Sequence, residues 1–437
     1  MEGSLSESVQ QIVRPGKCID YYYANEDTST KACFRTSVDT KFRQGWNSLS
    51  SGTNTLTIPP NNGVGDVVCV LQLPAITSNY ASLGLPAGWA YSLIKQITYR
   101  YGGTDTLSLT GQQVMEAVLS QATDGASRDA LMTLGGVSLS GTNPTTSAND
   151  FAGVNYAYVW LPLPHCKPSV VGKPCPFPSD LLTQTIVIQV EIYPLSSIFS
   201  VATGGSTAGI PSALSSAEFV VGQVALANQG QALAQRVDMT SHSYTYPIRW
   251  IQQETPITLT TPGLGASNTQ SITLTGFRNG EVREIHMWLQ AVSDIPVGGT
   301  IGNVVNPFKW YAPENVVVSY AGQQYAYYDF GSGQLWNILN GSVPSQVNST
   351  ILTQTGGAIV DNTAFAPAWA VLPFGQPYSA PTAHSAYLAG LPITNGQVQI
   401  QFTIPAGAPS STNYIVHVSY VYTACLALSQ GSAQYVF

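Results

Sequence analysis

Apolar and polar residues alternate with a period of two along most of the chain. The alternating segments are rich in Val, Ile, Thr and Tyr and end at Gly, Pro, Asn or Ser; examples are 54–58, 66–73, 93–101, 185–193, 271–276, 282–289, 315–320, 397–404 and 414–422. Successive side chains of a β-strand point to opposite faces, so this pattern is typical of half-buried strands. The sequence therefore predicts an all-β protein.

Helical periodicity is confined to three short segments. The clearest, 112–122, places Val114 and Val118 on one side of a helix. Segments 332–339 and 5–13 are shorter candidates. We expect these helices to lie in the connections between strands.

The two halves of the chain repeat one another. Four pairs of segments recur in the same order: 66–72 with 284–290, 97–103 with 316–322, 160–162 with 371–373, and 185–192 with 397–404. Their offsets are 218 (289 − 71), 219 (320 − 101), 211 (372 − 161) and 212 (404 − 192), each close to half of 437 residues. Short strands resemble one another, but four ordered matches at nearly one offset indicate an internal repeat.

The repeat predicts two similar modules joined near residues 235–246. A length of 437 residues suits two domains of roughly 200 residues better than one. About eight strands per module is the size of a jelly-roll β-sandwich. We therefore expect an N-terminal arm at 1–34, a first jelly roll at 35–240 and a second at 241–437, with short connecting helices.

The order of motifs resembles one known family. In the first half a strand ends in Tyr-Gly-Gly at 101–103, the helix 112–122 follows, and Trp-Leu-Pro-Leu-Pro stands at 160–164. In the second half Leu-Pro-Phe-Gly-Gln-Pro-Tyr-Ser at 372–379 precedes the last strands. This arrangement is similar to that of the double jelly-roll major capsid proteins of the adenovirus and large eukaryotic DNA virus lineage. The resemblance extends in outline over residues 35–426, and segment 203–217 has no counterpart in it.

The resemblance implies a structural function in a virion. Three copies with two similar modules each would form a pseudo-hexameric homotrimer that tiles an icosahedral shell. Loops 122–156 and 340–364 would form its outward crown and intersubunit surfaces, and the expected partners are neighbouring trimers, minor capsid proteins and vertex proteins. Segment 5–13 would lie inside the shell, where contact with an internal membrane and packing beneath the trimer are both open. Assembly would take place in the host cytoplasm or nucleus.

Charged residues make up 9% of the chain, against about 25% in an average soluble protein. A net charge of −7 argues against direct binding of nucleic acid, which needs a basic surface. Residues 1–13 lack a basic segment followed by an apolar run, so we expect no secretory signal. A neutral surface of Ser, Thr, Asn and Gln suits a subunit with neighbours on several sides, since unpaired charges are costly to bury.

The sequence offers few groups for catalysis or metal binding. Of the five histidines (His165, His242, His286, His384 and His417), His286 and His417 alternate with apolar residues and are interpreted as packed strand residues. The acids Glu191, Glu254, Glu281, Glu284 and Asp329 show no spacing that singles out a pair. The six cysteines are scattered and read as free thiols, and His165-Cys166 with Cys175 lacks zinc-site spacing. We expect no catalytic, cofactor-binding or metal-binding residue, no cofactor and no enzymatic activity.

Two other functions remain open at this point. An extracellular carbohydrate-binding or hydrolysing pair of β-sandwiches would predict a signal peptide, calcium-binding acids and a monomer. A shell-plus-protrusion capsid protein of a small RNA virus would predict a basic arm and two dissimilar domains.

Overall fold

The structure is a computed structural model. It describes residues 37–60, 63–78, 83–101, 107–119, 125–137, 139–140, 155–163, 177, 179, 182–201, 206–226, 244–259, 268–276, 280–292, 310–328, 369–374, 391–393, 397–405, 408, 412–429 and 432–436. Expectations about segments 1–34, 332–339 and 340–364, about the motif at 165–175, and about His242, His384 and Asp329 lie outside these residues.

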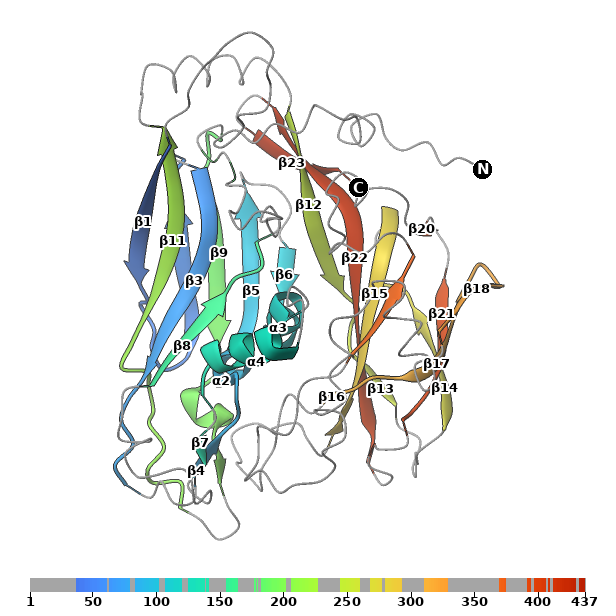
Figure 1. The fold of residues 1–437 in the computed structure, drawn as a ribbon, viewed down its shortest axis with the longest axis horizontal. Coiled ribbons are helices and arrows are strands. Elements are labelled where there is room, and N and C mark those ends of the chain that lie inside the picture. Colours follow the sequence, from blue (N-terminus) through green and yellow to red (C-terminus); the bar gives the residue numbers. More distant parts are fainter. Residues whose placement is uncertain are drawn as a thin grey trace.

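Two four-stranded antiparallel sheets form the first half of the molecule (Figure 1). One has the order β1 (Ser37–Gly45), β11 (Ser216–Leu226), β3 (Gly63–Leu73), β8 (Asn155–Trp160). The other has the order β2 (Gly52–Ile58), β9 (Ile186–Ile192), β5 (Ile94–Tyr101), β6 (Leu107–Leu109). A small sheet of β10 (Ser200–Val201), β4 (Leu83–Leu85) and β7 (Leu139–Ser140) accompanies them. Together with their helices, these sheets are called the first module.

Two further sheets form the second module. The larger has the path β12 (Tyr244–Gln253), β22 (Tyr414–Ser429), β15 (Gly280–Ala291), β16 (Trp310–Tyr311). Off this path, β13 (Ile257–Leu259) and β23 (Ser432–Val436) pair with β22, while β19 (Ala370–Pro373) and β20 (Leu391–Ile393) pair with β15. The smaller sheet has the order β14 (Thr269–Leu274), β21 (Val398–Thr403), β17 (Glu314–Tyr320), β18 (Gln323–Tyr328).

The sequence repeat is also a repeat of strand register. In the first module Val68 of β3 pairs with Val220 of β11 on one side and Trp160 of β8 on the other. In the second module His286 of β15 pairs with Ser419 of β22 and Val371 of β19. These pairs occupy equivalent positions, so β3 corresponds to β15, β11 to β22 and β8 to β19. The predicted boundaries 34/35 and 240/241 fall outside the described residues and stay predictions.

Helices lie in the connections of the first module. They are α2 (Trp89–Leu93), α3 (Gly111–Leu119), α4 (Gly125–Leu134) and the 3₁₀ helix η3 (Leu195–Ile198). Helix α3 confirms the helix expected near 112–122. Helix α4, by contrast, lies within segment 122–156, for which the sequence predicts a loop. Among the described helices, none is long and apolar enough to cross a membrane.

A capping box starts α3. The Thr110 backbone N–H donates to Gln113 Oε1 at 2.9 Å, and the Gln113 N–H donates to Thr110 Oγ1 at 3.4 Å. This reciprocal pattern satisfies N–H groups that the first helical turn leaves unpaired. Figure 1 shows α3 beside β6, on the side of the first module that faces β12, β22 and β15.

Candidate functional site: the interface between the modules

Helix α3 joins the two modules through polar side chains on neighbouring positions. Gln112 Nε2 donates to Gln290 Oε1 at 3.3 Å, and Gln113 Nε2 donates to Ser419 Oγ at 2.9 Å. One turn further, Glu116 Oε1 contacts His286 Nδ1. The helix therefore makes three polar contacts with β15 and β22 of the other module.

The face of β15 and β22 that receives α3 is polar, although it is buried. Glu284, His286, Trp288 and Gln290 alternate along β15 and share this face, which β22 extends with His417 and Ser419. All six residues are buried. The alternate positions of β15, such as Ile285, Met287 and Leu289, are apolar and buried as well. We call the polar set the seam: Gln112, Gln113, Glu116, Glu284, His286, Gln290, His417 and Ser419.

A histidine between two carboxylates lies at the centre of the seam. His286 Nδ1 contacts Glu116 Oε1 from the first module, and His286 Nε2 lies 3.0 Å from Glu284 Oε2 on its own strand. The side chains are 1%, 0% and 7% exposed for His286, Glu116 and Glu284, so water does not screen the group. Glu116 Oε2 is also buried and has no hydrogen-bond partner among the described residues.

The two carboxylates keep this histidine protonated. Burial lowers the pKa of His286, but the charges of Glu116 and Glu284 and the hydrogen bonds to them outweigh that effect and raise the pKa to about 9. At neutral pH an imidazolium therefore sits between the carboxylates. Such a buried ion pair adds little net stability compared with apolar packing, but removing one partner is costly, because the others remain buried and charged.

The second histidine of the seam is in the opposite charge state. His417 Nε2 lies 3.2 Å from Gln290 Oε1, and its ring stacks on Trp288 with centroids 5.2 Å apart. Burial lowers the pKa of His417 to about 4. Both histidines are buried strand residues, as the sequence predicts. The sequence does not show that His286 is ionised and bonded to a carboxylate of the other module.

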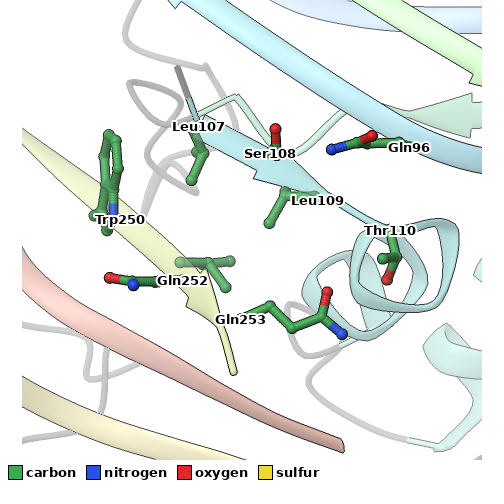
Figure 2. A pocket seen from close by; sticks show the side chains of 9 residues that line it. Gln96, Leu107, Ser108, Leu109, Thr110, Trp250, Gln252 and Gln253 are labelled. Carbon is green, nitrogen blue, oxygen red and sulfur yellow. The ribbon is translucent and has the colours of Figure 1, made fainter. Parts of the chain in front are cut away.

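A cavity of about 290 Å³ lies beside the seam. Its lining comes from Gln96, Leu107, Ser108, Leu109 and Thr110 of the first module and from Trp250, Ile251, Gln252 and Gln253 of the second. Figure 2 shows these side chains around the space between β6 and β12. The lining residues that the structure describes offer amide and hydroxyl groups, and none of them carries a charge.

Of the five acids named from the sequence, the four that the structure describes do not converge on one site. Glu191 pairs with Lys95 at 2.6 Å on the surface, and Glu254 accepts hydrogen bonds from Tyr420 Oη at 2.6 Å and the Gly276 N–H at 2.8 Å. Burial raises the pKa of Glu281. Among the described members of this set, only Glu284 faces another carboxylate through a shared partner, and that carboxylate, Glu116, is not one that the sequence singles out.

The described residues provide no metal centre. No group of three or more His, Cys, Asp and Glu side chains among them could hold a metal ion. Cys69 is a free and buried thiol, and burial raises its pKa. The polar contacts of the seam join the two sheets of the first module to the larger sheet of the second module.

Comparison by sequence found no relative: no protein-family model matches the chain, and no curated protein matches it.

Comparison by structure found capsid proteins. The crystal structure of VP54 of PBCV-1, fitted into a reconstruction of the virophage Sputnik, matches with a TM-score of 0.61 at 12% identity, covering 94% of this chain and 99% of that chain. The cryo-EM structure of the Sputnik virophage matches with a TM-score of 0.56 at 12% identity, covering 95% and 91%. The mavirus major capsid protein matches with a TM-score of 0.53 at 12% identity, covering 95% and 94%. The chain has their double jelly-roll fold, which confirms the predicted fold class and, at the level of fold, the resemblance.

Proposed function

We propose that this chain is a major capsid protein that forms pseudo-hexameric homotrimers and tiles an icosahedral viral shell. The observation that carries the proposal is that one chain holds two equivalent jelly rolls, joined by a buried polar seam, in the fold of known major capsid proteins. At 12% identity the likeness to these structures concerns the fold. The proposal about function therefore rests on the two equivalent jelly rolls and the seam between them.

The repeat supplies the geometry that such a shell needs. A threefold ring of three chains contains six similar modules, so it can fill a site with six neighbours without six identical chains. This use requires the two modules of a chain to keep one mutual orientation. The seam provides that constraint, because Glu116, Gln113 and Gln112 each require a matching polar group on β15 or β22.

The surface chemistry supports repeated packing against other copies. With 9% charged residues, the chain carries few groups that would lose hydration in a protein contact. Neutral hydroxyl and amide side chains can hydrogen-bond directly or through water in such contacts. The equivalent registers of β3 and β15 also argue against a shell-plus-protrusion protein, which would have two dissimilar domains.

The remaining parts of the proposal follow from this function. The chain would be a structural, non-enzymatic component of the virion, assembled in the host cytoplasm or nucleus. Its partners would be other trimers, minor capsid proteins and vertex proteins, with no direct contact to nucleic acid. The N-terminal arm at 1–34 would lie on the inner side of the shell, against an internal membrane or beneath the trimer.

Light scattering on the purified protein tests the proposal. We expect a particle of about 140 kDa, three times the 46.4 kDa of one chain, and negative-stain images with a pseudo-hexagonal outline. A monomer at all protein and salt concentrations would overturn it.

A further inference from the structure

We infer that the seam is a pH-controlled latch: it holds the two modules together while His286 is protonated, and it lets them separate as folded units when His286 loses its proton. The inference concerns contacts within one chain, so it is independent of the proposed function. It goes beyond a loss of overall stability, because it assigns the pH response to one contact between the modules. In a trimer of the proposed kind, this separation would release the orientation on which the pseudo-hexameric outline depends.

Only the protonated form of His286 can donate a hydrogen bond to both of its carboxylate partners. Its Nδ1 contacts Glu116 Oε1, and its Nε2 lies 3.0 Å from Glu284 Oε2. A neutral imidazole has one N–H donor and one acceptor nitrogen, so one carboxylate would then face a lone pair. Loss of the proton therefore makes one of the two contacts repulsive, in a group that is buried away from water.

Glu116 is the partner that is free to leave. Glu284 lies two residues before His286 on the same strand, so it stays beside the ring. Glu116 belongs to α3 of the first module, and its Oε2 has no hydrogen-bond partner among the described residues. Once the imidazole is neutral, Glu116 regains hydration by moving into water, since a buried carboxylate without a positive partner is costly. Because α3 carries Glu116, this movement separates α3 from β15.

The elements packed around His286 bring no further charge to it among the described residues. Its cross-strand neighbours are Ser419 on β22 and Val371 on β19. Helix α3 adds Gln113, which donates to Ser419. The other histidine of the seam, His417, has its pKa lowered to about 4 by burial, so it is neutral from pH 6.5 upwards. Within the described part of the seam, His286 is therefore the residue whose charge changes above pH 6.5.

The direction of the pKa shift places the release on the alkaline side. Burial lowers the pKa of His286, but Glu116 and Glu284 raise it to about 9 in the closed seam. In the open seam the imidazole meets water and has its ordinary pKa of about 6.5. Between these two values the closed form holds one proton more than the open form. Rising pH therefore favours opening by about tenfold per pH unit, and by about 300-fold in all, before the effect levels off.

Each module has an apolar core of its own, away from the seam. The larger sheet lies between α3 and the smaller sheet (Figure 1). Met287 and Leu289 alternate with the seam residues of β15 and so face the smaller sheet, where Ile400 is fully buried. In the first module Leu71 of β3 and Ile188 of β9 are fully buried.

The contact between the modules is packed less closely than these cores. The contacts that α3 makes with β15 and β22 through its glutamine and glutamate side chains are polar. A cavity of about 290 Å³ lies between β6 and β12, whereas protein interiors contain few voids larger than a water molecule. We therefore expect the modules to separate before either of them unfolds.

Hydroxyl-radical labelling of the full chain from pH 6.5 to 9.5 tests the latch. Trp288 lies between His286 and Gln290, both of which contact α3, so separation of the modules uncovers it. Trp89 of α2 is equally buried but belongs to the first module. We expect labelling of Trp288 to rise about tenfold per pH unit while the open form is the minor one, and Trp89 to stay protected. The exposed Tyr193 serves as the reference for the radical dose.

Two variants separate the latch from a general effect of alkali. His286→Gln places a neutral amide between two carboxylates, so Trp288 should be labelled at pH 7 about as strongly as in the wild type above pH 9. His286→Gln combined with Glu116→Gln is the matched control, because it also removes the carboxylate of the first module. This double variant should keep Trp288 protected at every pH. Circular dichroism at each pH shows whether the sheets are retained.

Three results would overturn the inference. If Trp288 and Trp89 of the wild type become labelled together, the chain unfolds as a whole and the modules do not separate as folded units. The inference is equally wrong if Trp288 stays protected up to pH 9.5, or if the double variant still responds to pH. Light scattering at pH 6.5 tests the proposed function separately: a monomer there would overturn that function and leave the latch intact.

Discussion

Glu116 and His286 lie 170 residues apart in the sequence and meet in a buried hydrogen bond between the two modules. Glu116 belongs to a helix of the first module and His286 to a central strand of the second. Because the group is buried away from water, the energy of each contact depends strongly on whether the other partners are present. The relative placement of the modules is therefore coupled to one ionised side-chain cluster.

Removing one member of this cluster should be strongly destabilising. In Glu116→Ala the protonated His286 loses the partner from the other module, and breaking a buried pair in this way costs about 3–5 kcal/mol. Thermal and urea unfolding of the full chain would measure the loss. Glu116→Gln is the matched control: it keeps the shape and a hydrogen-bonding group, so the expected loss is smaller. Equal losses for both variants would contradict an ionic role.

Replacing the whole cluster should restore most of that stability. The first module already has Val68 at the position of His286, which shows that the fold accepts an apolar residue there. Buried ion pairs exchanged for apolar groups of similar volume are often neutral or stabilising. We therefore expect Glu116→Leu, His286→Val and Glu284→Val together to be more stable than Glu116→Ala alone. A triple variant less stable than that single variant would indicate that the cluster contributes net stability.

The sequence predicts strands far better than it predicts this cluster. Alternation predicts a strand at 185–193, and the structure has β9 at Ile186–Ile192, because the period of two is a local property of a half-buried strand. The sequence does not single out Glu116. Helix α3 is buried on nearly all sides between the modules, so a polar residue on it does not indicate a solvent-exposed face. The contact between Glu116 and His286, which are 170 residues apart, leaves no local pattern in the sequence. The start of α3, by contrast, has a local signal in the capping box Thr110 to Gln113, which the expected helix at 112–122 did not use.

The two seam histidines should give the stability a maximum near pH 6.5. His286 has its pKa raised to about 9, so its protonation contributes stability that is fully present below pH 6.5 and is lost as the pH rises through about 9. His417 has its pKa lowered to about 4, so its contribution is present above pH 6.5 and is lost as the pH falls towards 4. Glu116 and Glu284 are the charged groups that face His286, while Gln290 and Trp288 face His417.

Melting temperatures from pH 4 to 10 would measure this dependence. His286→Gln should flatten the alkaline side relative to the wild type, and His417→Gln should flatten the acid side. Differences between variant and wild type are compared, because other carboxylates also titrate at low pH. An alkaline side that is unchanged in His286→Gln would show that another group controls it.

The position of α3 depends on one glycine. A Cβ at Gly111 would collide with the backbone oxygens of Tyr91 and Ile94, which rigid neighbouring elements hold in place. Gly111→Ala must therefore shift the first turn of α3, and with it Gln112, Gln113 and the seam. We expect a loss of about 2–4 kcal/mol in unfolding free energy, as for other backbone-strain and overpacking substitutions. Gly45→Ala is the matched control, because a Cβ there meets nothing within 4 Å, and its unfolding free energy should stay within about 0.5 kcal/mol of the wild type. If the two variants unfold alike, close packing of α3 against Tyr91 is not what holds the helix against the second module.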